Sequence, residues 1–122
     1  MTKEELRDYC YSIGLIDTVS IKLEKSCYTS AYRYDCQFVN RYDFIAAWDE
    51  VKQNVAIAKR CEIDEEVFVN EPIRMLGVSL VENDEEIKTR ISELIQSVQE
   101  NIKFLKWKQM KKRMKEIEGD FE

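Results

Sequence analysis

The sequence predicts a single α+β domain in which helices pack against a small antiparallel sheet. Apolar residues recur at helical spacing near both ends of the chain, and between positions 18 and 39 they alternate with polar residues. The 122 residues include only 3 Gly and 1 Pro, which favours a few long elements over many tight turns. We expect one domain over residues 1–122, because this length suits one compact core.

The chain begins with the pattern of a short helix. Thr2 and Glu5 have the spacing of a capping box. Gly14 is suited to the position that follows a helix end. We expect a helix over about 3–13, with its apolar face formed by Leu6, Tyr9, Cys10 and Ile13.

In the next two stretches, apolar and polar residues alternate, as they do in half-buried strands. The first covers 17–25, and the second covers 30–40. The polar segment between them is short enough for a turn, so we expect a hairpin over 18–39 that is covered on one face only. The apolar faces would be Val19, Ile21 and Leu23 in the first strand, and Tyr32, Tyr34, Cys36 and Phe38 in the second.

The next segment predicts a helix over about 41–60. Asn40 could cap it, and Lys59 and Arg60 suit the negative end of a helix dipole. Its apolar residues have spacings of three and four, at Phe44, Ala47, Trp48, Val51, Val55 and Ala58.

The stretch 62–82 predicts one or two short strands that extend the hairpin into a sheet. "VFV" and "MLGVSLV" have strand-like composition, and Pro72 and Gly77 would then lie at an edge or a bulge. The alternative is a short helix with Pro72 in its first turn.

A long helix is predicted from Asn83, which has Glu86 three residues later, to Gly119. A first apolar stripe consists of Ile87, Ile91, Leu94, Val98, Ile102 and Leu105. The spacing then changes, and a second, rotated stripe consists of Trp107, Met110, Met114, Ile117 and Phe121. Such a helix is about 50 Å long, longer than a compact domain of this size is wide. The segment 103–122 would therefore project, bend back or pack on a second copy.

Charge is segregated along the chain, whose formal net charge is -5. Residues 1–102 hold 12 of the 19 bases and 20 of the 24 acids. The segment "KFLKWKQMKKRMK", 103–115, holds the other seven bases and no acid, and 116–122 holds four acids. This distribution creates a local positive field that the net charge conceals.

The basic segment has four interpretations. It could be a solvated helix face, a membrane-surface helix, a nucleic-acid-binding segment or an amphipathic helix that docks on a protein. The acids after Lys115 weigh against a membrane surface, and the acidic body would repel DNA. The anchors for a protein partner would be Phe104, Trp107, Met110 and Met114. The contacts to phosphate would be Lys103, Lys106, Lys108, Lys111, Lys112, Arg113 and Lys115.

A tyrosine-rich segment is a second candidate surface. It brings Tyr28, Tyr32 and Tyr34 close to Arg33. These side chains could be a buried sheet face, a protein-recognition surface or a platform for stacked bases.

The sequence lacks the residues that several kinds of catalytic and cofactor-binding site require. The chain contains no His, which excludes Ser–His and Cys–His nucleophiles within one chain. The four Cys are widely spaced and the Gly are isolated, so we expect no metal site, no phosphate loop and no cofactor. No apolar run reaches the length of a membrane span and no secretory signal is evident, so we expect a cytoplasmic protein with reduced thiols.

These observations favour a non-catalytic protein-binding module. A concrete form is a small phage or mobile-element inhibitor or adaptor, which occupies the surface of a nucleic-acid-handling protein through electrostatic complementarity. We also expect a homodimer formed through the long helix. The alternative is a nucleic-acid-binding regulator that uses residues 103–115.

Overall fold

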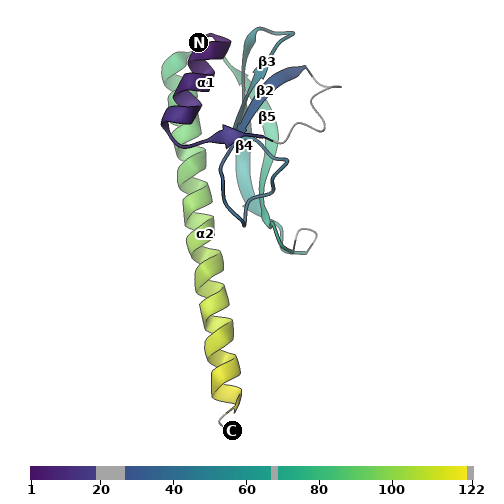
Figure 1. Ribbon diagram of the computed structural model, residues 1–122, viewed down its shortest axis with the longest axis vertical. Coiled ribbons are helices and arrows are strands. Elements are labelled where there is room, and N and C mark those ends of the chain that lie inside the picture. Colours follow the sequence, from purple (N-terminus) through teal and green to yellow (C-terminus); the bar gives the residue numbers. More distant parts are fainter. Residues whose placement is uncertain (19–26, 67–68, 121–122) are drawn as a thin grey trace.

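The computed structural model describes residues 1–18, 27–66 and 69–120, and the side chains in these ranges up to residue 115. Figure 1 shows two helices on one side of a curved sheet, and the second helix extends well beyond it. The predicted α+β class is confirmed. In chain order the elements are α1 (Lys3–Ser12), β1 (Ile16–Asp17), β2 (Tyr28–Arg33), β3 (Ala46–Asp49), β4 (Asn54–Ile63), β5 (Ile73–Val81) and α2 (Asp84–Asp120).

The five strands form one antiparallel sheet whose spatial order follows the sequence. The longest pairing joins β4 and β5, from Val55 opposite Val81 to Ile63 opposite Ile73. This pairing leaves β5 at one edge of the sheet, immediately before α2.

The main core lies between the sheet and the helices. From α2 it receives most of the first apolar stripe, and from α1 it receives Leu6 and Cys10, which have no exposed surface. Burial of this stripe was expected from its spacing, and it holds the first half of α2 against the sheet. The stripe residues that are buried are Ile87, Ile91, Leu94, Val98 and Leu105, and Ile102 is partly buried.

Both ends of α1 have the caps that the sequence predicts. The Glu5 amide donates to the Thr2 hydroxyl, and the Glu5 carboxylate accepts from the Thr2 amide, which completes the capping box. At the other end Gly14 has a φ of 90°, and the Leu15 amide donates to the Cys10 carbonyl. This arrangement is a Schellman motif, and it turns the chain into β1.

The predicted helix over 41–60 is wrong, because this segment forms β3 and β4. All four residues of β3 are buried, and so are the first apolar residues of β4, so neither strand shows the alternation of a half-buried strand. The turn between them is closed by the Asp49 carboxylate, which accepts from the Lys52 amide at 2.9 Å. Gln53 has a φ of 51°, in the left-handed region that glycine usually occupies.

The second predicted strand is shorter than expected. β2 ends at Arg33, and residues 34–45 cross to the opposite edge of the sheet, where Val39 pairs with Ile73 in an isolated parallel bridge. The first predicted strand, 17–25, falls mostly outside the described ranges, and Ile16 and Asp17 pair with β2. Of the two short strands predicted within 62–82, the second is confirmed as β5. The first includes residues 67–68, which lie outside the described ranges.

The long C-terminal helix is confirmed. Its first turn is capped by Asn83, whose side-chain oxygen accepts from the Glu86 amide at 3.0 Å. α2 continues beyond the sheet without a break (Figure 1).

Candidate functional site

Four large apolar side chains lie exposed on the projecting part of α2. We call Phe104, Trp107, Met110 and Met114 the exposed stripe; 47–55% of each residue is accessible. At about 100° per residue, the stripe lies almost opposite the core-facing side of the helix. The sheet therefore cannot cover the exposed stripe. The change of register in the sequence corresponds to a change from the core-facing side of α2 to the side exposed to solvent.

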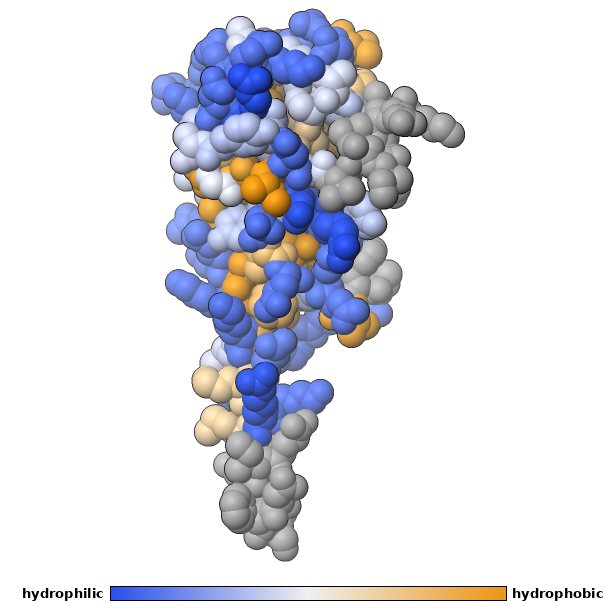
Figure 2. Space-filling model, viewed as in Figure 1, coloured by the Kyte–Doolittle hydropathy of each residue, from blue (hydrophilic) through white to orange (hydrophobic). Residues whose placement is uncertain are grey.

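Two residues of the exposed stripe, Phe104 and Trp107, contact neighbouring side chains on the helix. The rings of Phe104 and Trp107 are 6.1 Å apart, and the Lys111 ammonium lies 4.4 Å from the centre of the indole ring. The second contact is a cation–π interaction, which combines an apolar surface with a positive charge. Figure 2 shows pale orange apolar side chains beside blue polar ones near the projecting end.

The cations of the basic segment have different surroundings. Lys108 forms an ion pair with Glu65, at 2.6 Å between Nζ and Oε2, and Lys111 is placed over Trp107. The other five are exposed and form no ion pair with any side chain in the described ranges; they are Lys103, Lys106, Lys112, Arg113 and Lys115.

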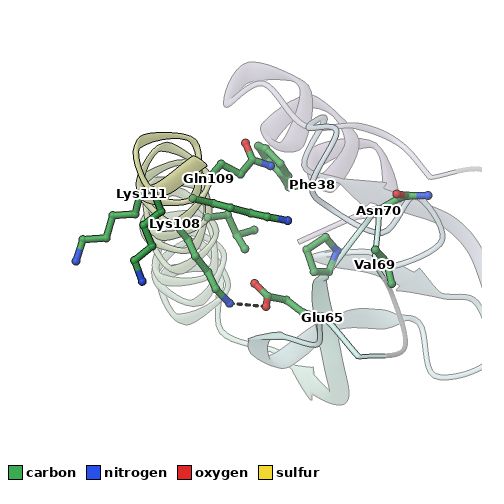
Figure 3. Close-up of a pocket in the computed structure, with 11 residues that line it drawn as sticks. Phe38, Glu65, Val69, Asn70, Lys108, Gln109 and Lys111 are labelled. Carbon is green, nitrogen blue, oxygen red and sulfur yellow. Dashed lines mark hydrogen bonds and ion pairs between the residues drawn. The ribbon is translucent and has the colours of Figure 1, made fainter. Parts of the chain in front are cut away.

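A cleft of about 720 Å³ lies between the projecting helix and the segment before β5. Figure 3 shows the Lys108 side chain extending towards Glu65 across this cleft, and Lys111 extending away from it. One wall is therefore basic and the other carries a carboxylate, so the cleft is not uniformly positive. Its lining consists of Phe38, Glu65, Val69, Asn70, Pro72, Leu105, Lys108, Gln109, Lys111, Lys112 and Lys115.

The sequence-based interpretation missed the far wall of this cleft. Glu65, Val69 and Asn70 are about 40 residues away from the helix that they face, and no periodic pattern connects the two segments. The acids around position 65 gave the only signal, because they could have been matched with the lysines by charge alone.

The tyrosine-rich segment is largely used for packing. Tyr32 is 2% exposed, and its ring lies edge-on to that of Tyr11 at 5.7 Å. Tyr28 is half-buried against Phe44, with ring centres 5.3 Å apart. Arg33 and Tyr34 are also half-buried. Tyr32 therefore belongs to the core, while Tyr28, Arg33 and Tyr34 keep partial exposure and stay a predicted surface.

Two of the four thiols are protected from ionisation by burial. Burial raises the pKa of the Cys10 thiol to about 12, and the Cys61 pKa is also raised by burial. Across the described ranges, no three Cys, Asp or Glu side chains converge as metal ligands do. None of the helices in the described ranges is long and apolar enough to cross a bilayer.

Comparisons with protein-family models, curated proteins and solved structures each find no match to this chain. Function must therefore be inferred from the surfaces themselves, and the exposed stripe is a feature that packing within the described part of the chain does not explain.

Proposed function

We propose that this protein is a non-catalytic protein-binding module that docks through the exposed stripe on α2. The observation that supports the proposal is the exposure of Phe104, Trp107, Met110 and Met114 together on one face. Single exposed apolar residues are ordinary, but neighbouring ones of this size favour an interaction site. Trp is also among the residues most enriched at binding hot spots, and Met adapts its shape to a partner surface.

A preformed helix with an apolar face suits docking in a hydrophobic groove of a partner. Each stripe side chain is already about half covered, so its burial in a complex contributes roughly 1 kcal/mol, half of the value for full burial. The surrounding lysines would add electrostatic attraction towards a partner with acidic groups at the rim of its groove.

The concrete form that we propose is a cytoplasmic inhibitor or adaptor of a nucleic-acid-handling protein, of the kind that phages and mobile elements encode. Its support is the acidic body, because residues 1–102 hold 20 acids and 12 bases. Such a surface can compete for a basic nucleic-acid channel. We also propose that the chain forms a homodimer through α2, because a second copy can cover the same stripe.

A photo-cross-linking experiment tests the docking surface. Benzoyl-phenylalanine is placed at Met110 in one variant and at Gln99 in the other, as a matched position on α2 outside the stripe. The protein cross-linked through position 110 is identified, purified and titrated with wild type and with a Trp107→Glu/Met110→Glu variant. We expect at least a tenfold loss of affinity in the double variant, with an unchanged circular dichroism spectrum.

Equal affinity of wild type and the double variant for that partner would contradict docking through the stripe. A second titration in 0.5 M salt tests the electrostatic part, because salt screens exposed charges at this concentration. Affinity that does not change in 0.5 M salt would exclude the competition for a basic channel.

A nucleic-acid-binding regulator is the second candidate. It is supported by the five cations of the basic segment that have no ion pair within the described ranges. Labelled single-stranded and duplex DNA are titrated at 50 and 200 mM salt with wild type and a Lys106/Lys108/Lys111/Lys112→Glu variant. Affinity should fall steeply with salt and in the variant. Absence of wild-type binding at 50 mM salt would exclude this function.

A further inference from the structure

The exposed stripe has the spacing of a helix-pairing seam, and this inference rests on the proposed homodimer through α2. Trp107, Met110 and Met114 are followed by Ile117, so the intervals are three, four and three residues. These are the intervals of the a and d positions of a heptad. α2 remains helical to Asp120, so the backbone continues the seam to this residue.

We propose that the stripe is covered by α2 of a second copy, which lies antiparallel to the first. In antiparallel pairs an a position faces a d position of the other helix. One register places Met110 opposite Met114 of the second copy. The two-fold axis repeats this contact.

The charges of the helix end favour the antiparallel direction. The basic segment 103–115 is followed directly by the acidic segment 116–122, so each end meets the opposite charge when the helices run antiparallel. In a parallel pair, Lys106 would face Lys111 of the second copy, and like charges would repel.

The placement of the sheet leaves room for this pairing. The sheet covers the side of α2 that carries Ile91 and Val98, and the stripe lies on nearly the opposite side. In an antiparallel pair the two globular bodies lie at opposite ends, and only the projecting segments touch. A parallel pair would also bring together the exposed polar residues before the stripe, such as Ser92, Gln96 and Gln99.

The seam is short, so the dimer is expected to be weak. A coiled coil is indicated by apolar a and d positions over about three or four heptads, and this seam has fewer than two. We expect association in the high micromolar range, as in a transient interface.

Sedimentation velocity from 10 µM to 1 mM tests the self-association. We expect wild type to move from the 14.6 kDa monomer towards twice that mass as concentration rises. Met110→Glu should remain monomeric throughout this range. Gln99→Glu is the matched control, because it introduces the same charge on α2 outside the seam, and it should dimerise like wild type.

Disulfide trapping tests the direction. Met110→Cys and Met114→Cys are made in a Cys36→Ser background, mixed in equal amounts and oxidised with copper phenanthroline. Antiparallel pairing predicts mainly the mixed disulfide, resolved by mass spectrometry, and little disulfide in either variant alone. The background without a new Cys is the control for native thiols.

The outcomes separate this inference from the proposed function. A wild type that is monomeric at 1 mM overturns the self-pairing, but docking of the stripe on another protein can still be observed by cross-linking. Dominant Met110→Cys homodisulfides overturn the antiparallel direction. A stripe variant that loses dimerisation and still binds its cross-linked partner normally would overturn docking of the stripe on that partner and support the self-pairing.

Discussion

Arg74 and Asp43 connect the edge strand β5 to the long segment between β2 and β3. The Arg74 Nε donates to the Asp43 carboxylate at 2.6 Å, and a second guanidinium nitrogen donates at 3.2 Å. The same carboxylate accepts from the Met75 amide at 3.0 Å. The Asp43 carboxylate thus pairs with the Arg74 charge and also accepts from a backbone amide of β5. These bonds hold the irregular segment between β2 and β3 against the edge strand.

Asp43→Ala should therefore destabilise the fold. We expect a loss of about 1.5–3 kcal/mol, because hydrogen bonds to charged groups are removed from a half-buried site. Urea unfolding checks this value. Arg60→Ala is the matched control, since the Arg60–Glu62 pair is exposed and should contribute less than about 0.5 kcal/mol. Equal losses in both variants would contradict a special role for Asp43.

The Asp49 carboxylate should make stability depend on pH. Its pKa is lowered chiefly by the hydrogen bond from the Lys52 amide, and the Cys27 thiol also donates to it. Because the folded pKa lies below the unfolded one, the stabilisation is present above roughly pH 4 and is lost as pH falls through the folded pKa. The stability difference between wild type and Asp49→Asn, measured in urea at pH 7 and pH 3, should shrink at pH 3.

The Cys10 thiol should be inert in the folded protein. It has no exposed surface, and its pKa is raised to about 12 by burial. Thiolate is the reactive form, so iodoacetamide at pH 8 should leave Cys10 unmodified and should modify it in guanidinium. Peptide mass spectrometry gives the result, and the partly exposed Cys36 is the internal control. Modification of Cys10 and Cys36 at equal rates would show that α1 opens readily.

Two glycines with positive φ should respond differently to substitution. Gly14 has a φ of 90° and open space where a Cβ would lie, whereas Gly77 has a φ of 71° and a Cβ there would approach Lys59 Cδ to 3.0 Å. Gly14→Ala should cost about 1 kcal/mol for the left-handed backbone alone. Gly77→Ala should cost more unless Lys59 moves aside, and thermal unfolding compares the two variants directly.

Patterns that depend on one buried face were predictable from sequence. The caps of α1 and the core-facing stripe of α2 follow from residues close together in the chain, and they were predicted. The segment 41–60 was not, because Ala46, Ala47 and Trp48 are buried on both faces of β3 and so lose the two-residue period. The turn after Asp49 contains neither Gly nor Pro, so the usual sign of a break was also absent.

The part of the candidate site that depends on a local pattern was also predictable from sequence. The change of register near Trp107 is local in sequence, and it predicts that Trp107, Met110 and Met114 leave the core-facing side of the helix. The cleft beside α2 depends on Glu65 and Asn70, whose position follows from the pairing of β4 with β5. Sheet pairing over this distance is set by tertiary packing, which periodicity within a segment does not encode.

The unbroken course of α2 has a consequence for the energy of docking. A helix as short as segment 103–115 is marginal on its own in water, because nucleation is unfavourable. Here the packed half of α2, which includes Ile91 and Val98, already forms the nucleus, and the projecting part needs only propagation. A partner therefore meets a helix whose backbone entropy was lost during folding of the domain, and an isolated peptide of the same sequence should bind more weakly.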